Sequence, residues 1–386
     1  MHIIHRRTLL AAAAMLGLAG PGRAASPTSK TSSPAPGPQF GAALPLSGPY
    51  ALEGDETLRG IQLAIDVVNA GGGIAGAPVA LAQADMPAQP GAAGAVNWLI
   101  SSHNVNILLG SGASALSYPA TAAAELAQTP FIELTAMADG IMTRGFKYLL
   151  RTCPTTGMAG KLAASTIQSH FTGRKLGLLF NTGAAAGAIA AAVTAALNAA
   201  KLPITLSAGY PEDAVDLSEQ AERMMRAKVD VLLHAAGPND SLALFQAMKG
   251  LNWRPATLIG LGNGYELRDT QAAIGGALDG TLVIAAPFFP GPAQQIADAY
   301  AARYAVPPRS AESCTAYVGA KLVFDTLNTV GADPTKLLNA MRKLNLAPGL
   351  LLNGFGARFD ASGQNTASFV TLQRWKDGAL VAAQTT

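Results

Sequence analysis

The strongest constraint on the fold is a strand–helix–strand unit over residues 40–85. An apolar run over 40–46 stops at a Ser-Gly-Pro turn, which is typical of a buried strand that ends in a loop. Apolar residues then recur at the spacing of one helix face from Leu58 to Val68, and three glycines at 71–73 end the helix. A second strand over 78–84 completes a βαβ unit. In a parallel sheet, the first loop of such a unit is where a ligand binds.

The same alternation continues along the chain and restarts once, which predicts an α/β protein of two halves. Further strands are expected over 105–110, 130–134, 147–151, 175–180, 206–210, 229–235, 257–260 and 281–285. Helices are expected over 91–101, 118–127, 160–170, 184–200, 217–227, 241–250, 294–304, 314–329 and 334–344. A strand over 368–375 between turn signals indicates a terminal antiparallel hairpin. We therefore predict two doubly wound parallel-sheet lobes with a ligand cleft between them.

Length and charge narrow the class of protein. A chain of 386 residues is too long for one ordinary core and suits two domains. With 49% hydrophobic and 13% charged residues, it is neither disordered nor typical of a nucleic-acid-binding protein. The formal charge of +3 includes Arg6, Arg7 and Arg23 of an apparent leader, so the mature chain is near neutral. No nucleic-acid partner is expected.

The first 25 residues have the pattern of an export signal. Two arginines, Arg6 and Arg7, precede an apolar run over 9–19 and small residues at 22–26. The arginine pair resembles a twin-arginine signal, and a Sec signal with two ordinary arginines is the alternative. The run of about 11 residues is too short to span a bilayer. We expect cleavage of residues 1–25, a flexible linker over 26–38 and a periplasmic location.

The sequence offers little for metal or covalent chemistry. Cys153 and Cys314 could form a disulfide in an oxidising compartment or remain free thiols. The mature histidines, His103, His170 and His234, lack metal-ligand spacing. His234 is either a ligand-cleft residue or a histidine at a strand end with satisfied hydrogen bonds. No nucleophile elbow of the form G-x-S-x-G occurs. We expect no metal, no cofactor and no catalysis.

Several segments together resemble type I periplasmic solute-binding proteins of ABC importers, in particular the leucine/isoleucine/valine-binding proteins. They are Pro45-Leu46-Ser47-Gly48, Gly54, Gly60, the segment 69–76, Asp85, Thr143-Arg144-Gly145, Arg151-Thr152, Pro154 and the segment 354–364. Their order and spacing carry the resemblance, which covers about residues 39–381. The resemblance implies two lobes that close on a ligand like a hinged clamp.

The resemblance also implies three crossings between the lobes. We place them near 151–154, 286–288 and 354–359. The N-terminal lobe would then comprise residues 39–151 plus 288–354. The C-terminal lobe would comprise 152–287 plus 355–386.

The ligand site implied by the resemblance begins with a serine that holds a carboxylate. Ser114 matches that serine, and a helix N-cap is its alternative role. Met137 falls where the family has a threonine, and Thr135 lies nearby to compensate. The residues expected to bind ligand are Ser114, Ala113, Thr135, Ala136, Met137, Glu53, Gly237, Asn263 and Tyr265.

The second lobe departs from the amino-acid binders. Their aromatic residue, their second tyrosine and the glutamate that pairs with the ligand ammonium fall here at 185–186, near Gly237 and near Gly262. A buried ammonium without a carboxylate is costly. Glu53, Asp240 and Glu266 could in principle serve, but none stands at the matching place, and Glu53 falls where relatives have an aromatic. These departures predict a roomier, less polar pocket.

The sequence therefore predicts the periplasmic substrate-binding component of an ABC-type importer. Its ligand would be a small organic solute, either amino-acid-like or an aromatic or apolar carboxylate. The expected partners are that ligand and a membrane permease, and the protein would be a monomer. Two alternatives stay open: a periplasmic ligand sensor or regulatory subunit on the same fold, and a secreted α/β enzyme, for which no catalytic constellation is present.

Overall fold

The computed structural model describes residues 37–383. The predicted export signal and nearly all of the predicted linker lie outside these residues. Within 37–383, no helix combines the length and the apolar character needed to cross a membrane.

The first sheet consists of five parallel strands in the order β2-β1-β3-β4-β5. The strands are β1 (Phe40–Leu44), β2 (Leu81–Asp85), β3 (Ile107–Gly110), β4 (Phe131–Glu133) and β5 (Leu149–Arg151). Most of their residues are apolar and buried, as expected for a parallel sheet that helices cover on both faces.

Side chains of alternating direction divide the first sheet into two faces. Leu44 and Leu109 face a core with helices α1 (Ala51–Ala70) and α10 (Glu312–Thr329). Their neighbour Leu108 faces the opposite core with helices α2 (Gln89–His103) and α3 (Ser114–Leu126). The sheet thus directs each helix pair to one side by the period of two along its strands.

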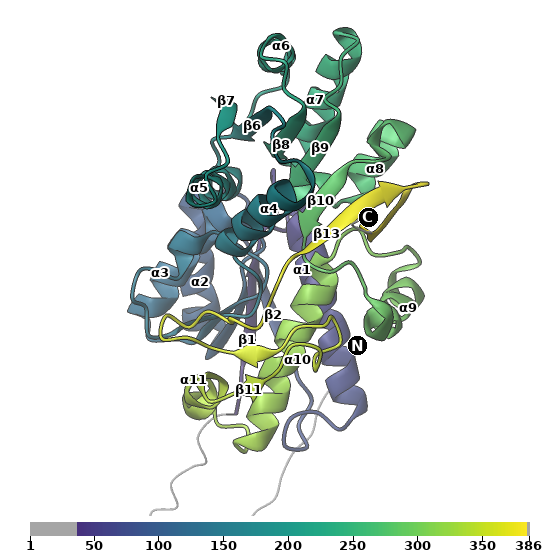
Figure 1. Ribbon diagram of the computed structural model, residues 1–386. Coiled ribbons are helices and arrows are strands. Elements are labelled where there is room, and N and C mark those ends of the chain that lie inside the picture. Colours follow the sequence, from purple (N-terminus) through teal and green to yellow (C-terminus); the bar gives the residue numbers. More distant parts are fainter. Residues whose placement is uncertain (1–36, 384–386) are drawn as a thin grey trace, which may run out of the picture. The chain divides into compact units, whose positions relative to one another are not determined.

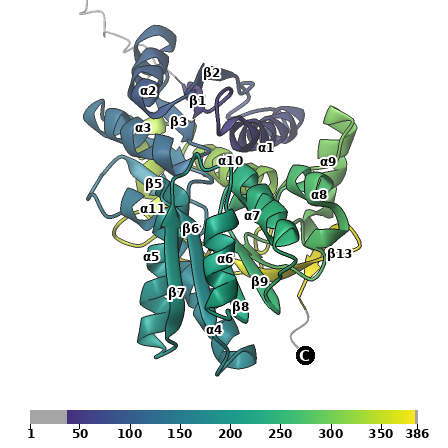
Figure 2. The same cartoon turned by 90° about the horizontal axis from the view of Figure 1, so that it is seen from above.

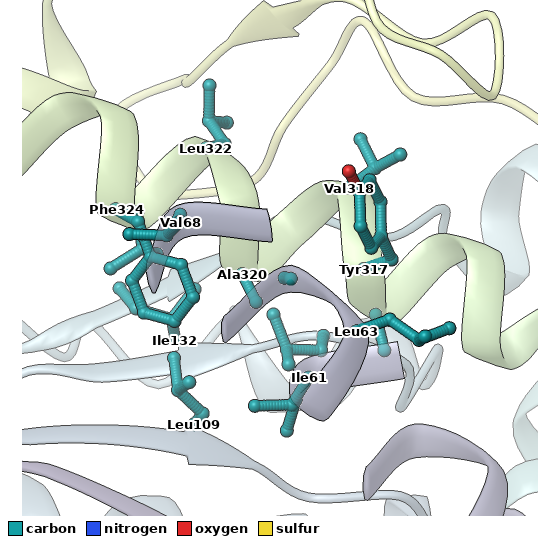
Figure 3. Close-up of a cluster of buried hydrophobic side chains, with 14 of the residues drawn as sticks. Ile61, Leu63, Val68, Leu109, Ile132, Tyr317, Val318, Ala320, Leu322 and Phe324 are labelled. Atoms are coloured by element: carbon teal, nitrogen blue, oxygen red, sulfur yellow. The ribbon is translucent and has the colours of Figure 1, made fainter. Parts of the chain in front are cut away.

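Helices α1 and α10 lie side by side although about 250 residues separate them in the chain (Figure 1). Figure 3 shows Val68 beside Phe324, with Ile132 and Leu109 of the sheet below them. The helices approach closely at Gly60, where a methyl group would lie 2.2 Å from the carbonyl oxygen of Ser313. Glycine is required there because no side chain fits.

The second sheet has seven strands in the order β14-β13-β10-β9-β8-β6-β7. Its strands are β6 (Leu176–Asn181), β7 (Ile204–Tyr210), β8 (Val231–Ala235), β9 (Thr257–Leu261), β10 (Leu282–Ala285), β13 (Thr371–Lys376) and β14 (Ala379–Ala382). The first five are parallel, and β13 and β14 add an antiparallel hairpin at one side. The predicted terminal hairpin is confirmed.

Two helix pairs cover the second sheet. Leu178 faces α4 (Thr156–His170) and α5 (Ala184–Ala199), and its neighbour Leu179 faces α6 (Ser218–Arg226) and α7 (Pro238–Gly250). Figure 2 shows these elements around strands β6 to β9. The α/β class with two parallel-sheet lobes is therefore confirmed.

The remaining elements lie in connections within each sheet or between the two sheets. They are the short helix α8 (Arg268–Ile274), helices α9 (Gln294–Tyr304) and α11 (Pro334–Arg342), the paired strands β11 (Asn345–Leu346) and β12 (Ala357–Arg358), and four 3₁₀ turns over 139–141, 263–265, 275–278 and 291–293. The chain passes from the first sheet to the second after β5, returns after β10, and passes to the second sheet again before β13. Ala357 and Phe359, at the predicted third crossing, pack in the core of the first sheet. The lobe bounds themselves stay a prediction.

Candidate functional site

A cavity of about 600 Å³ lies where loops from both sheets meet. Its lining residues follow the carboxyl ends of parallel strands: Pro49, Tyr50 and Glu53 after β1, residues 112–115 after β3, residues 135–137 after β4, Asn181 at the end of β6, residues 236–240 after β8, and Gly262, Asn263 and Glu266 after β9. Strand ends of this kind carry the ligand sites of open α/β sheets. Eight of the nine residues predicted to bind ligand line this cavity, and Tyr265 does not.

The start of α3 forms part of the first wall. Ser114 is the first residue of the helix, and Ala113 is the N-cap residue without a side-chain cap. The predicted alternative role of Ser114 as an N-cap is therefore wrong. Its hydroxyl accepts a hydrogen bond from the Ala138 N–H at 3.3 Å. The first N–H groups of a helix have no intrahelical acceptor, so those of Ser114 and Ala115 can bind an anionic group.

The loop after β4 is held from behind by a buried carboxylate. The N–H groups of Thr135 and Ala136 donate to Glu133 Oε1 at 3.3 and 3.0 Å. The Thr135 hydroxyl lies 3.2 Å from the Thr57 hydroxyl. These backbone donors are thus already used, and Thr135 can offer a ligand its side chain but not its N–H.

Tyr265 and His234 belong to the core of the second sheet. His234 is fully buried, with Nε2 2.6 Å from the Tyr210 hydroxyl and Nδ1 2.5 Å from the Tyr265 hydroxyl. Burial lowers the pKa of His234 to about 3, so the ring is neutral. Of the two roles left open for His234, the structure shows the satisfied buried histidine.

Six carboxylates line the cavity: Glu53, Glu212, Asp213, Asp240, Glu266 and Glu312. None of the lining residues, all within the described 37–383, is a lysine, arginine or histidine. The ion pairs found over that range leave all six out. The surface of the cavity is mostly apolar, in line with the predicted less polar pocket, but acidic side chains that are distant in sequence converge within it.

Three of the glutamates influence one another. Burial, together with the nearby Glu53 and Glu56, raises the pKa of Glu266 to about 7. The pKa of Glu312 is raised well above its usual value by burial and by Glu266, Glu53 and Glu56. Burial also raises the pKa of Glu53. Like charges in a partly buried site repel strongly. These three carboxylates therefore lower the stability of the folded protein unless protons or a bound cation neutralise them.

Two hydrogen bonds cross the cavity between the loop and helix after β1 and the second sheet. The Tyr50 hydroxyl donates to Glu212 Oε1 at 2.8 Å. The Asn263 side-chain amide donates to Glu53 Oε1. Asp240 stays within the second wall, where the Tyr210 hydroxyl and the Asn181 amide donate to its Oδ2, each at 2.7 Å.

The crossing segments are joined beneath the cavity. Arg151 Nε donates to Gln364 Oε1 at 2.5 Å, and the Gln364 amide donates to the Cys153 carbonyl at 2.9 Å. At the second crossing, the Gln373 amide donates to the Ala286 carbonyl at 3.0 Å. These bonds connect the segments that a hinge motion would have to bend.

The two cysteines are free and buried. Burial raises the pKa of Cys314 to about 12 and that of Cys153 well above its usual value. Of the two cysteine states left open, the structure shows the free thiols. In the part of the chain that the structure describes, no group of three or more histidine, cysteine or acidic side chains is arranged to hold a metal ion.

Sequence reasoning missed several lining residues, including Tyr50, Asn181, Glu212, Asp213 and Glu312. Asn181 stands at the end of the expected strand 175–180, and Glu212 and Asp213 follow the expected strand 206–210. The rule that ligands bind at strand carboxyl ends could have found these three. Glu312 carries no such signal, because it begins a helix of the first sheet.

Comparison with known proteins agrees with this architecture. The model of the periplasmic binding protein family matches residues 38–379. The chain is 33% identical over 363 residues to Leu/Ile/Val-binding protein homolog 8 of Brucella abortus, covering 89% of both chains. Its fold resembles that of the branched-chain amino acid transporter substrate binding protein LivJ from Streptococcus pneumoniae in complex with isoleucine (TM-score 0.78, 21% identity, 89% of this chain and 98% of that one).

A similar likeness holds for an ABC transporter solute binding protein from R. palustris in complex with 4-hydroxybenzoate (TM-score 0.79, 19% identity, 90% of this chain and 96% of that one). At these identities, the two solved structures establish a common fold. The family model, which matches nearly the whole described chain, and the Brucella relative at 33% identity establish the family as well. The chain therefore belongs to the periplasmic binding protein family and is similar to its Leu/Ile/Val-binding members.

Proposed function

We propose that the protein is the solute-binding component of an ABC-type importer and holds an amino-acid-like solute in the cavity between its two sheets. The observation that carries the proposal is the cavity itself. Its walls come from both sheets, with helix-terminal N–H groups at Ser114 on one side and carboxylates such as Glu53 and Glu266 on another. A zwitterion presents the two charges that these walls would bind.

Function would follow from the difference in ligand affinity between two arrangements of the lobes. A solute that contacts both walls stabilises the closed arrangement only, and the population shifts by that difference in affinity. The segments around Arg151, Ala286 and Gln364 would be the hinge. A membrane permease in the importer would then bind the closed protein and receive the solute, and no bond of the solute would be made or broken.

Of the two predicted ligand classes, the lining favours the amino-acid-like one. An aromatic or apolar carboxylate would place its charge among six acidic side chains without a basic residue in the lining to offset them. Burial of an unpaired charge of this kind is strongly unfavourable. An ammonium group reverses the sign of every one of these interactions.

The test is to identify the solute that the protein carries. The protein is purified from its own host, unfolded to release bound molecules, and the released fraction is analysed by mass spectrometry. Calorimetric titration of the refolded protein then measures the affinity for each candidate. We expect one amino-bearing solute to bind with a one-to-one stoichiometry. Enzymatic turnover of the bound compound, or failure of every released solute to bind again, would contradict the proposal.

A further inference from the structure

The charge of the cavity exceeds what a simple zwitterion needs. One ligand carboxylate at the start of α3 and one ammonium beside a single glutamate would balance each other. The cavity instead holds six carboxylates, and the lining drawn from residues 49–312 includes no basic side chain. Within the second wall, Asp240 is satisfied by two donors, and Tyr50 donates to Glu212. The excess lies in the cluster Glu53, Glu266 and Glu312, where Asn263 donates to Glu53 but one buried oxygen of Glu312 has no partner among the described residues.

An orphaned atom in this cluster points to a donor from outside the chain. Glu312 Oε2 is buried and, in the part of the chain that is described, has no hydrogen-bond partner. Glu266 is only 8% exposed and Glu53 only 3%, and all three line the cavity. An unpaired buried carboxylate oxygen is costly, and a bound N–H donor with positive charge would remove that cost.

The cluster is not arranged for a metal ion. Over residues 37–383, no three histidine, cysteine or acidic side chains come together with metal-site geometry. The cavity also has an apolar side formed by Ala185, Ala186, Ile189 and Ile284. A volume of about 600 Å³ with one apolar side fits an organic molecule that has methylene groups between its charges.

We infer that the solute is an organic cation with at least two amino or guanidinium groups on an apolar stem, one of which binds among Glu53, Glu266 and Glu312. This inference rests on the proposed role as a solute-binding component and names its substrate class. Two kinds of solute share the chemistry. A basic amino acid would also place its carboxylate at Ser114, and a linear polyamine would leave the start of α3 unoccupied.

A calorimetric panel on the refolded protein, stripped of bound solute, tests the inference. The probes are lysine and arginine, each with two cationic groups and one carboxylate, putrescine and spermidine as a dication and a trication, leucine as a zwitterion, and 4-hydroxybenzoate as an anion. We expect at least one of the first four to bind 100-fold or more tightly than leucine and 4-hydroxybenzoate. Binding of lysine or arginine alone indicates the amino-acid source, and binding of putrescine or spermidine alone indicates the polyamine source.

Charge-neutralising variants locate the cation. Glu266→Gln and Glu312→Gln should each weaken binding of the tightest cation at least tenfold, because each removes one negative charge from the cluster. Glu222→Gln is the matched control. It makes the same chemical change at a surface glutamate that pairs with Arg226 at 2.6 Å. Its affinity should stay within twofold of the wild-type value. Equal losses in all three variants would overturn the assignment to this cluster.

The outcomes separate the inference from the proposed function. Tight binding of leucine or 4-hydroxybenzoate with no binding of the four cations overturns the inference and leaves the solute-binding role intact. Failure of the whole panel, and of a metabolite extract from the host, overturns both. If calcium or magnesium chloride binds and displaces the organic cation, the cluster is a metal site, and the inference is overturned too. The panel on the wild-type protein tests the substrate class even if a variant does not fold.

Discussion

Two carboxylate sites in this protein, one around Glu133 and one around Glu312, differ in how the hydrogen-bonding capacity of their buried oxygens is satisfied. Glu133, beneath the first sheet's loops, is fully buried and accepts hydrogen bonds from the Ser111 N–H, the hydroxyls of Ser111 and Ser117, and the N–H groups of Thr135 and Ala136. The cavity glutamate Glu312 has a buried oxygen without any partner among the described residues.

The difference separates a structural charge from one that awaits a ligand. Five donors replace the water that Glu133 loses, so this carboxylate holds two loops of the first wall in place. In the cluster of Glu53, Glu266 and Glu312, Asn263 donates to Glu53, but one buried oxygen of Glu312 has no partner among the described residues, and the three carboxylates repel one another. A protein retains such an arrangement at a cost in stability, which is typical of binding sites. Substitutions at the two sites test this contrast, and the largest effect is expected at Glu133.

Removal of the satisfied carboxylate should be the most damaging change. Glu133→Ala leaves its donors buried without an acceptor, which should lower the free energy of unfolding by about 3–5 kcal/mol. Urea denaturation followed by circular dichroism measures the loss. Glu125→Ala is the control. Glu125 is only partly buried and accepts from the N–H groups of Lys147 and Tyr148, so about 1 kcal/mol is expected. Equal losses of unfolding free energy in the two variants would contradict the structural role of Glu133.

Neutralising a cavity glutamate should have the opposite sign and depend on pH. The pKa of Glu266 is raised to about 7, so between about pH 4.5 and pH 7 the folded protein binds a proton that the unfolded chain has released. Stability contributed by this group is therefore present at low pH and is lost as the pH rises through 7. In the absence of solute, the stability gained by Glu266→Gln relative to wild type should grow from near zero below about pH 4.5 to about 3 kcal/mol above pH 7.

The quantity to compare is the difference in free energy of unfolding between wild type and Glu266→Gln at each pH. His234, whose pKa is lowered to about 3, acts in the other direction, since the unfolded chain binds its proton below about pH 6.5 and stability falls on acidification. That contribution is the same in both chains and cancels. Urea midpoints at pH 5 and pH 8 supply the difference. A stability difference that does not grow with pH would show that Glu266 is not under electrostatic stress.

Most of the fold, and only part of the site, could be predicted from the sequence. The period of apolar residues predicted nearly every strand and helix, because burial of a sheet face or helix face requires it. It also predicted the loops around Ser114 and Thr135. The position of Glu312 depends on how α10 packs against α1 at Gly60, a contact between segments about 250 residues apart.

Tyr265 shows the converse error. It follows strand β9 at the place where a ligand residue is expected, yet its ring folds back over Gly260, where a Cβ atom would lie 2.2 Å from the ring. The Tyr265 hydroxyl then bonds His234 in the core rather than facing the cavity. Sequence spacing places a residue at a strand end, and the neighbouring small residue decides where its side chain goes.

A smaller effect is expected on the first wall, where a neutral donor rather than a charge meets the ligand. Ser114→Ala should weaken binding of a carboxylate-bearing solute by about fivefold, which corresponds to about 1 kcal/mol for one hydrogen bond. Ser117→Ala is the matched control in the same helix. Its hydroxyl donates to Glu133 at 2.6 Å, so the change should lower stability and leave affinity unaltered. Unchanged affinity in Ser114→Ala would show that the Ser114 hydroxyl does not contact the ligand and serves only to accept the Ala138 N–H.

The smallest effect should come from the single side-chain donor that residues 37–383 give Glu212. Burial and Glu212 raise the pKa of Tyr50, so its hydroxyl remains a donor at neutral pH, and it crosses the cavity to Glu212 Oε1 at 2.8 Å. Tyr50→Phe removes one partly exposed hydrogen bond of the closed arrangement, which should raise the solute dissociation rate by about two- to fivefold, or about 0.5–1 kcal/mol. Stopped-flow displacement measures that rate. Because the bond forms only when the walls meet, the association rate should stay within twofold; a change confined to association would mean that Tyr50 acts on solute entry instead.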